Sequence, residues 1–188
     1  MIDIAEAGTK ATSEIARSLA QIDEDAAARA VAMCADARRI ALYGVGREGL
    51  MMKGLAMRLF HLGLDAHVVG DMTTPRLGEG DLLIVSAGPG YFSTVSALVA
   101  TARAAGAKTL CITAQADGES ARLCDAVLVL PAQTMADDTG REAAISILPM
   151  GSLFEGVQYL AFELLIMALR ERLGESAETM RARHTNLE

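Results

Sequence analysis

Two side chains in the last fifth of the chain have the chemistry of proton transfer. Glu155 stands at the start of a long apolar segment, where a helix N-terminus would keep it ionised, and His184 lies in a polar tail. A carboxylate can take a proton from carbon, and an imidazole exchanges protons near neutral pH. A simpler interpretation stays open for each. Ser152-x-x-Glu155 fits a capping box, which the spacing alone favours, and a lone histidine in a tail is usually solvated.

A glycine-rich segment suggests a phosphate site. Gly44-Val45-Gly46-Arg47-Glu48-Gly49 follows a short apolar run and opens a helical pattern. Its G-x-G-x-x-G spacing lets backbone N–H groups hold a phosphate at a helix start. The same spacing occurs in dinucleotide-binding proteins, and Asp71 could bind a ribose. We favour a monophosphate because the chain is too short for a second, substrate-holding domain. A role in packing strand against helix also stays open for these glycines.

Further candidates follow the other apolar runs. In a parallel sheet, ligands bind beyond the carboxyl ends of the strands. The loops at that edge should begin after Tyr43, Val69, Val85 and Ile112. Arg47 could pair with a phosphate or with sugar hydroxyls, or it could be an exposed cation at a helix start. The candidate phosphate-binding or substrate-binding residues are Gly44, Gly46, Arg47, Ser86, Ser93, Thr94 and Thr113.

The order of apolar runs predicts an α/β protein. Five short runs have the length and composition of buried strands; they lie at residues 39–43, 66–69, 81–85, 108–112 and 126–130. Helical patterns alternate with them and flank them, at residues 8–38, 50–62, 95–105, 119–123, 152–173 and 176–183. The alternation predicts a three-layer, doubly wound sheet of five parallel strands, with an N-terminal helix and a long C-terminal helix. Residues 133–142 are polar and predict an exposed loop.

Composition limits the possible functions. The chain has 188 residues, 52% of them hydrophobic and 22% charged, which suits one domain with a large core. A net charge of −7 argues against nucleic acid and membrane surfaces as partners. Three cysteines without a C-x-x-C pair predict neither a disulfide framework nor a zinc site. We expect no leader peptide and no apolar run long enough to span a membrane, and therefore a cytoplasmic protein.

Five segments together resemble the sugar isomerase (SIS) family, and most closely its 6-phospho-3-hexuloisomerases. The similarity extends over nearly the whole chain, and the last two segments are the most specific. The segments are Gly44-Val45-Gly46-Arg47, Ala56-Met57-Arg58-Leu59-Phe60-His61-Leu62-Gly63, Thr73-Thr74-Pro75, Pro149-Met150-Gly151-Ser152-Leu153-Phe154-Glu155 and Arg183-His184-Thr185-Asn186-Leu187-Glu188.

The resemblance implies a fold and an activity. It implies a flavodoxin-like SIS fold in a single domain over residues 1–188, with a helical segment at 1–38, an α/β core at 39–173 and a tail at 174–188. It implies interconversion of 3-hexulose 6-phosphate and fructose 6-phosphate, an aldose–ketose-type proton shift through an enediolate. No cofactor and no metal are expected. Glu155 becomes the candidate base, and His184 the candidate for opening the sugar ring or moving a hydroxyl proton.

The same resemblance implies a homotetramer with sites near subunit boundaries, so that the tail bearing His184 would reach a neighbouring subunit. The long segment at 152–173 supports a homo-oligomer independently, because it is apolar on more than one face. His61 and His67 are expected to be structural.

Two departures from the family pattern leave another function open. The family has Ser-Gly-Ser-Gly-Glu-Thr after the third strand, whereas this chain has a longer loop at residues 86–94 that includes Pro89, Tyr91 and Phe92. Glu48 replaces a serine, and a carboxylate repels a nearby phosphate. The alternative is an SIS domain that binds a different sugar phosphate or a sugar-like ligand, with or without catalysis.

Overall fold

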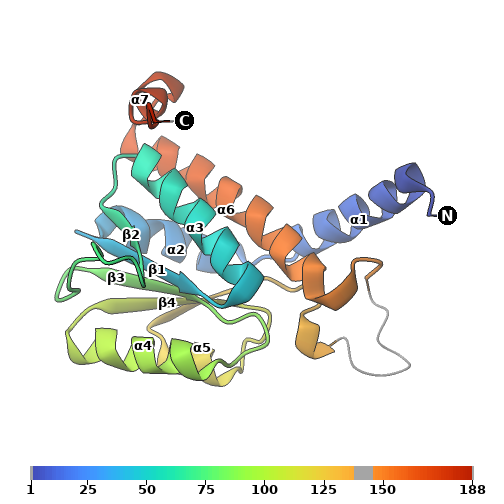
Figure 1. Cartoon of the computed structure of the whole chain (residues 1–188), viewed down its shortest axis with the longest axis horizontal. Helices are drawn as coiled ribbons and strands as arrows, with labels where there is room; N and C mark the ends of the chain where they lie inside the picture. Colours follow the sequence, from blue (N-terminus) through green and yellow to red (C-terminus); the bar gives the residue numbers. More distant parts are fainter. Residues whose placement is uncertain (1, 138–145, 188) are drawn as a thin grey trace.

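Five parallel strands form the central sheet (Figure 1). The computed structural model describes residues 2–137 and 146–187. In space the strands follow the order β2-β1-β3-β4-β5, so the order changes direction between β1 and β3. This arrangement confirms the predicted sheet. The strands are β1 (Ile40–Gly44), β2 (Ala66–Val68), β3 (Leu82–Ser86), β4 (Lys108–Thr113) and β5 (Ala126–Val129).

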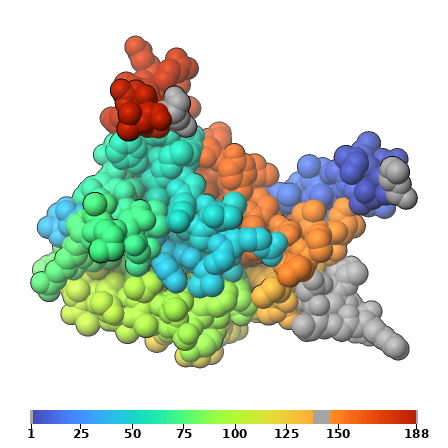
Figure 2. Space-filling view, viewed as in Figure 1, coloured from blue at the N-terminus to red at the C-terminus, as the bar shows by residue number. Residues whose placement is uncertain are grey.

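Helices cover both faces of the sheet (Figure 1). On one face lie α2 (Glu24–Asp36), α3 (Gly46–His61) and α6 (Ser152–Leu173), and on the other lie α4 (Ser93–Ala104) and α5 (Glu119–Leu123). The first helix, α1 (Ile4–Leu19), contacts α6 and projects from the body of the molecule, as Figure 2 shows. The short helix α7 (Ala177–Ala182) follows α6 and contacts α3.

The N-terminal segment is two helices, where the sequence pattern predicted one. The first helix ends at Leu19, and Asp23 takes an extended conformation. The Asp23 carboxylate accepts a hydrogen bond of 2.7 Å from the N–H of Ala26 and so caps the second helix. Alanine-rich composition favours helix on both sides of this position, and it therefore obscured the break.

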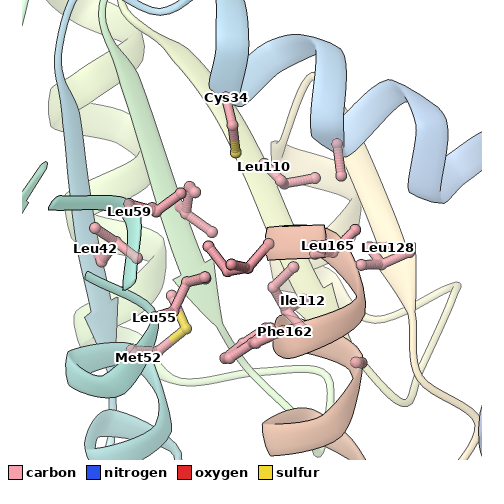
Figure 3. Packing of buried hydrophobic residues seen from close by; sticks show 14 of the residues in the cluster. Cys34, Leu42, Met52, Leu55, Leu59, Leu110, Ile112, Leu128, Phe162 and Leu165 are labelled. Carbon is pink, nitrogen blue, oxygen red and sulfur yellow. The ribbon is translucent and has the colours of Figure 1, made fainter. Parts of the chain in front are cut away.

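The core lies in two layers, because successive side chains of each strand point to opposite faces of the sheet. Ile40, Leu42 and Ile84 point to the face covered by α2, α3 and α6. Figure 3 shows Leu42, Leu110 and Ile112 of this layer packed with side chains of α3 and α6. The intervening residues of the strands, such as Leu83, pack against α4. Both faces are apolar, which explains why the strands read as continuous hydrophobic runs.

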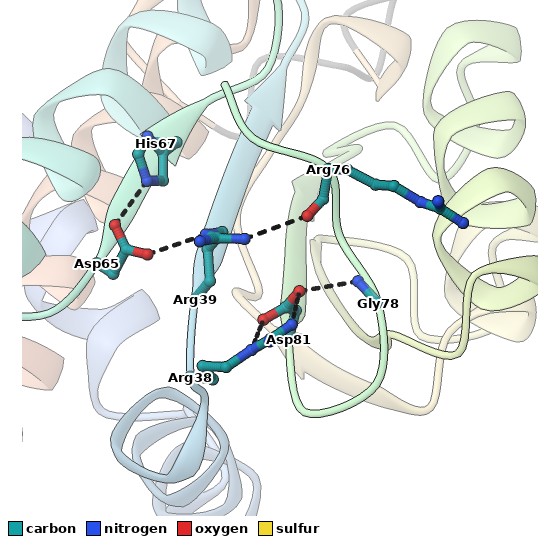
Figure 4. A network of polar contacts seen from close by, with 7 residues as sticks. All are labelled: Arg38, Arg39, Asp65, His67, Arg76, Gly78 and Asp81. Atoms are coloured by element: carbon teal, nitrogen blue, oxygen red, sulfur yellow. Dashed lines mark hydrogen bonds and ion pairs between the residues drawn. The ribbon is translucent and has the colours of Figure 1, made fainter. Parts of the chain in front are cut away.

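A network of charged residues ties together the amino-terminal starts of three strands (Figure 4). Asp81, before β3, accepts hydrogen bonds of 3.0 and 2.9 Å from the Arg38 guanidinium. Asp65 accepts from Arg39 and contacts the His67 ring, each at 2.9 Å or less. This network lies at the sheet edge opposite the carboxyl ends of the strands, so it stabilises the fold and leaves the other edge for a ligand.

By length and composition alone, the long helix α6 is apolar enough to cross a membrane, whereas the sequence predicted no segment of that length. Its inner face nevertheless packs on α1, α2 and α3, and nine of its residues are buried. These contacts are those of a core helix.

The predicted exposed loop at residues 133–142 is only partly described, because residues 138–142 lie outside the described residues. In the described part the prediction is wrong for Gln133 and Thr134, which are buried at 7% and 3% exposed, and is confirmed for Met135 and Ala136, which are exposed. The Asp137 carboxylate accepts hydrogen bonds from the N–H and the hydroxyl of Thr134, at 3.0 and 2.9 Å. Such local bonds satisfy polar groups that a buried loop would otherwise leave unpaired.

Candidate functional site

The sheet topology places a site at the carboxyl ends of β1 and β3. Gly44 ends β1 and lies in register beside Ser86, which ends β3. The strand order changes direction between these two strands, and ligands of doubly wound sheets bind at such a point. The helices α3 and α6 both begin near this edge and run side by side away from it (Figure 1).

The glycines of the G-x-G-x-x-G segment have different structural roles. A Cβ added to Gly49 would lie 2.5 Å from the carbonyl oxygen of Gly44, and one added to Gly44 would lie 2.9 Å from the Gly49 N–H nitrogen. These two glycines therefore allow β1 and α3 to pack closely, which is the packing role that the sequence left open. Gly46 is exposed and has a φ of +57°, a conformation that favours glycine. It lets the chain turn from the strand into the helix.

Arg47 positions the start of α6. Its guanidinium donates a hydrogen bond of 2.7 Å to the Ser152 hydroxyl and a short one to the Met150 carbonyl. Met150 and Gly151 both have positive φ, at 57° and 74°, so α6 begins from a left-handed turn capped by Gly151. The capping box, which was the alternative interpretation, does not form: Ser152 is already inside the helix, and its hydroxyl donates to the Pro149 carbonyl at 2.8 Å.

Without a capping role, the Glu155 carboxylate is available for chemistry. Oε1 lies 3.3 Å from Nη2 of Arg47, and the side chain is 16% exposed. Oε2 is buried, and none of the described residues forms a hydrogen bond with it. Withdrawal from water raises the pKa of Glu155 above its ordinary value, although the positive charge of Arg47 opposes this shift. Its raised pKa makes the Glu155 carboxylate a stronger base than a carboxylate that feels only the positive end of a helix dipole.

A second carboxylate, Glu48, lies beside these groups. It is 6% exposed, and its Oε2 accepts a short hydrogen bond from the Ser86 hydroxyl and one of 2.9 Å from the N–H of Gly88. Gln158 of α6 donates to the same Ser86 hydroxyl oxygen at 2.8 Å. Burial raises the pKa of Glu48, and the nearby charge of Glu155 adds to this effect. The sequence predicted only that Glu48 would repel a phosphate; its burial and its contact with the loop after β3 were missed.

Of the four hydroxyls predicted to bind phosphate, two are engaged inside the protein. Ser86 is fully buried in the contact with Glu48. The Thr113 hydroxyl donates to the Ala87 carbonyl at 2.7 Å and accepts from the N–H of Gln115 at 3.0 Å. Ser93 and Thr94 are exposed at the first turn of α4.

The N-terminus of α4 is open to a ligand in one respect. The residue before the helix is Phe92, whose side chain cannot accept a hydrogen bond from the first turn. The free N–H groups of a helix start attract anions.

His184 lies at the other end of α3. Its ring stacks on the ring of His61, with centroids 5.1 Å apart. Nearby, Arg183 donates to both Glu175 oxygens at 2.9 Å and to the His61 carbonyl at 3.0 Å. Because the 16 residues of α3 extend about 24 Å at about 1.5 Å per residue, one chain does not bring its own His184 to Glu155.

Comparisons with known proteins identify the family of this chain. A family model of the SIS domain matches residues 33–155, which include β1 to β5 and end at Glu155. The chain belongs to the SIS domain family. This SIS protein is 38% identical to the 3-hexulose-6-phosphate isomerase of Mycobacterium gastri over 175 residues, which cover 93% of this chain and 86% of that protein. It is 34% identical to the 3-hexulose-6-phosphate isomerase of Bacillus subtilis over 176 residues, which cover 94% of each chain.

Solved structures extend the likeness of this SIS protein to three dimensions. A hypothetical protein from Methanococcus jannaschii, whose structure is described as inferring a molecular function of 3-hexulose-6-phosphate isomerase, has a TM-score of 0.82 and 26% identity. The match covers 97% of this chain and 99% of that one. Another hypothetical protein of solved structure has a TM-score of 0.85 and 28% identity over 94% of this chain.

Proposed function

We propose that this SIS protein is a sugar-phosphate isomerase that interconverts 3-hexulose 6-phosphate and fructose 6-phosphate. The observation that carries the proposal is the Glu155 carboxylate, whose buried Oε2 has no hydrogen-bond partner among the described residues and which lies beside Arg47 at the point where the strand order changes direction. The relatives named 3-hexulose-6-phosphate isomerase support the same substrate.

The reaction moves one proton between neighbouring carbons. In 3-hexulose 6-phosphate the carbonyl is at C3, and in fructose 6-phosphate it is at C2. Glu155 takes the proton from C2, the electron pair forms a C2–C3 double bond, and the same carboxyl returns the proton to C3, while the hydroxyl proton passes from the C2 oxygen to the C3 oxygen. Arg47 lies where it can hold the oxygens that gain negative charge in the enediolate. No electron is gained or lost, so the step needs no cofactor.

The start of α4 is the proposed anchor for the phosphate. Ser93 and Thr94 present exposed hydroxyls there, and the first N–H groups of the helix carry a partial positive charge. The internal bonds of Ser86 and Thr113 make them supports of this loop rather than donors to the ligand.

The proposed active form is a cytoplasmic homotetramer. Large apolar side chains on the outer faces of two neighbouring helices are 40–60% exposed, and a second subunit would cover them. They are Leu50, Met57 and Phe60 on α3 and Tyr159, Leu160, Leu164 and Met167 on α6. In such an assembly the exposed His184 of one subunit would open the sugar ring in the site of another.

Turnover by the purified protein tests the proposal. We expect it to convert 3-hexulose 6-phosphate to fructose 6-phosphate with a kcat of about 1–1,000 per second, as enzymes commonly show. Product would be followed by coupled oxidation of the glucose 6-phosphate formed from it. Absence of fructose 6-phosphate after prolonged incubation would contradict the proposal.

A second candidate is binding of a different sugar phosphate or a neutral sugar-like ligand. The observation that favours it is Glu48, which occupies the Ser86 hydroxyl and the Gly88 N–H at the start of the loop after β3. Thermal melting with a panel of sugar phosphates and neutral polyols separates the two, since a ligand that binds the folded state raises its stability. Stabilisation by neutral polyols alone would favour the second candidate.

A further inference from the structure

Glu48 is a carboxylate at the proposed site for which the proposed mechanism has no use. It lies on the first turn of α3, one residue after Arg47. Its side chain is buried, whereas Arg47 and Leu50 are exposed. Through Ser86 it connects to Gln158, which lies on α6 one turn beyond Glu155. Glu48 is therefore part of the same cluster of side chains as the proposed base.

The hydrogen bonds of Glu48 distinguish its two oxygens. Oε2 accepts from both the Ser86 hydroxyl and the Gly88 N–H. The hydroxyl proton of Ser86 is directed to Glu48 because Gln158 Nε2 already donates to the Ser86 oxygen. None of the described residues donates a hydrogen bond to Oε1. A proton on this carboxyl consequently resides on Oε1, the oxygen that is free to exchange it.

Gly88 makes the space for this carboxyl. A Cβ at Gly88 would lie 3.0 Å from Glu48 Oε1 and 2.8 Å from Cε1 of Phe154, the residue before the proposed base. The loop after β3 thus lacks a side chain at the one place where it would cover Oε1 and separate it from the start of α6.

The surroundings of Glu48 favour a neutral carboxyl that can give up a proton. Arg47 forms its ion pair with Glu155, and no cation among the described residues lies within ion-pair distance of Glu48. The charged and titratable groups that face it are Arg47 from α3, Glu155 from α6 and the Cys111 thiol from β4. Burial without a paired cation raises the pKa of this carboxyl, although the hydrogen bonds from Ser86 and Gly88 and the charge of Arg47 oppose the shift. An uncharged amide oxygen could accept the same hydrogen bonds from Ser86 and Gly88, so a purely structural role would not need a carboxyl at this position.

We propose that Glu48 is a second acid–base residue, which exchanges protons with the substrate oxygens while Glu155 moves the carbon-bound proton. This assignment rests on the proposed isomerase function. As Glu155 takes the C2 proton, negative charge develops on the C3 oxygen beside Arg47, and protonated Glu48 gives its proton to that oxygen of the enediolate. Glu48 then takes the proton of the C2 hydroxyl as Glu155 protonates C3. Both carboxyls return to their starting states. His184 of a neighbouring subunit then has the role of opening the sugar ring.

The test compares Glu48→Gln with wild type and with Glu171→Gln, a control at an exposed position near the end of α6. We expect Glu48→Gln to lower kcat at least about 100-fold with KM changed less than about twofold, because the amide keeps the hydrogen bonds but cannot transfer a proton. The wild-type kcat should fall on the alkaline side as Glu48 ionises, and the variant should lack that limb. A Glu48→Gln enzyme with kcat within about threefold of wild type would overturn the assignment.

Two further results separate the possible failures. An inactive wild type would overturn the proposed function and this assignment together, whereas an active wild type, an inactive Glu155→Gln and an active Glu48→Gln would overturn the assignment alone. If Glu48→Gln does not fold, Glu48→Asp serves instead. Aspartate keeps the transferable proton on a shorter side chain, so we expect it to retain more activity than Glu48→Ser, and the reverse order would contradict the assignment.

Discussion

At the scale of single residues, the burial of Glu48 should make stability depend on pH. The pKa of Glu48 in the folded protein is raised above its ordinary value of 4.5, mainly because the carboxyl is withdrawn from water. The folded state therefore binds this proton more tightly than the unfolded state, and stability is lost as pH rises above about 4.5. Glu48→Gln removes this loss. We expect its melting temperature to exceed that of wild type at pH 7 and the difference to disappear near pH 4.

Melting curves from pH 4 to pH 8 measure this effect, with Glu171→Gln as the exposed control. A difference between Glu48→Gln and wild type that stays constant across this range would contradict the expected linkage. The measurement does not depend on activity, so it tests the burial of Glu48 separately from its chemical role.

The two carboxylates show what residue types can and cannot predict. Glu155 could be selected from its position before a long apolar segment, but the spacing favoured a capping box. The cap is excluded by the left-handed turn at Met150 and Gly151, which no spacing rule for Ser152 and Glu155 contains. Glu48 was interpreted as a repulsive neighbour of a phosphate because a sequence does not show burial. The available signal was that Glu48 replaces a serine of the family pattern in a chain that has a glycine at position 88, where a side chain would contact this carboxylate.

At the scale of secondary-structure elements, the loop after β3 depends on Gly88. We expect Gly88→Ala to destabilise the protein by about 1–3 kcal/mol, because its Cβ would contact the buried ring of Phe154 and the Glu48 carboxylate. The matched control is Gly8→Ala on the exposed helix α1, where no atom lies within 4 Å of the added Cβ. That substitution should stabilise the helix by about 0.5–1 kcal/mol. Urea denaturation measures both, and equal effects of the two substitutions would contradict the packing of this loop.

Most elements follow from local patterns, and their ends follow less well. The five apolar runs predicted the five strands because both faces of the sheet are covered, so that the strands are mostly apolar. The limits of α6 were predicted at Ser152 and Leu173, where Gly174 ends the helix in a left-handed conformation. The break before α2 was missed although Asp23 and Glu24 form a helix-start signal. Alanine on both sides had outweighed it.

At the scale of the whole molecule, the separation of Glu155 and His184 makes a prediction about assembly. If His184 acts in the site of a neighbouring subunit, Glu155→Gln and His184→Ala chains should each be inactive alone. Mixed assemblies made by co-expression should recover activity, because some sites then combine an intact Glu155 with an intact His184. Kinetic assays on purified mixtures, with their size measured by light scattering, test this. Mixed oligomers that stay inactive, or a monomeric wild type, would contradict the arrangement.

The sequence could indicate an oligomer but not the partner surfaces. Leu160, Leu164 and Met167 are exposed on α6, whereas Leu165 and Ile166 on the same turns are buried in the core. The sequence pattern shows that the helix is apolar around much of its circumference. It does not show which stripe faces the sheet and which faces a second subunit, since both demand the same residue types.

The role of Glu155 as the base is the claim on which the rest depends. Its most direct test is the kcat for 3-hexulose 6-phosphate of Glu155→Gln beside that of Glu171→Gln, the same change at an exposed position near the end of α6. We expect Glu155→Gln to lose at least about 100-fold, because the amide cannot accept the C2 proton, while its melting temperature stays within a few degrees of wild type. Glu171→Gln should retain kcat within about twofold. Equal turnover by the two variants would contradict the account.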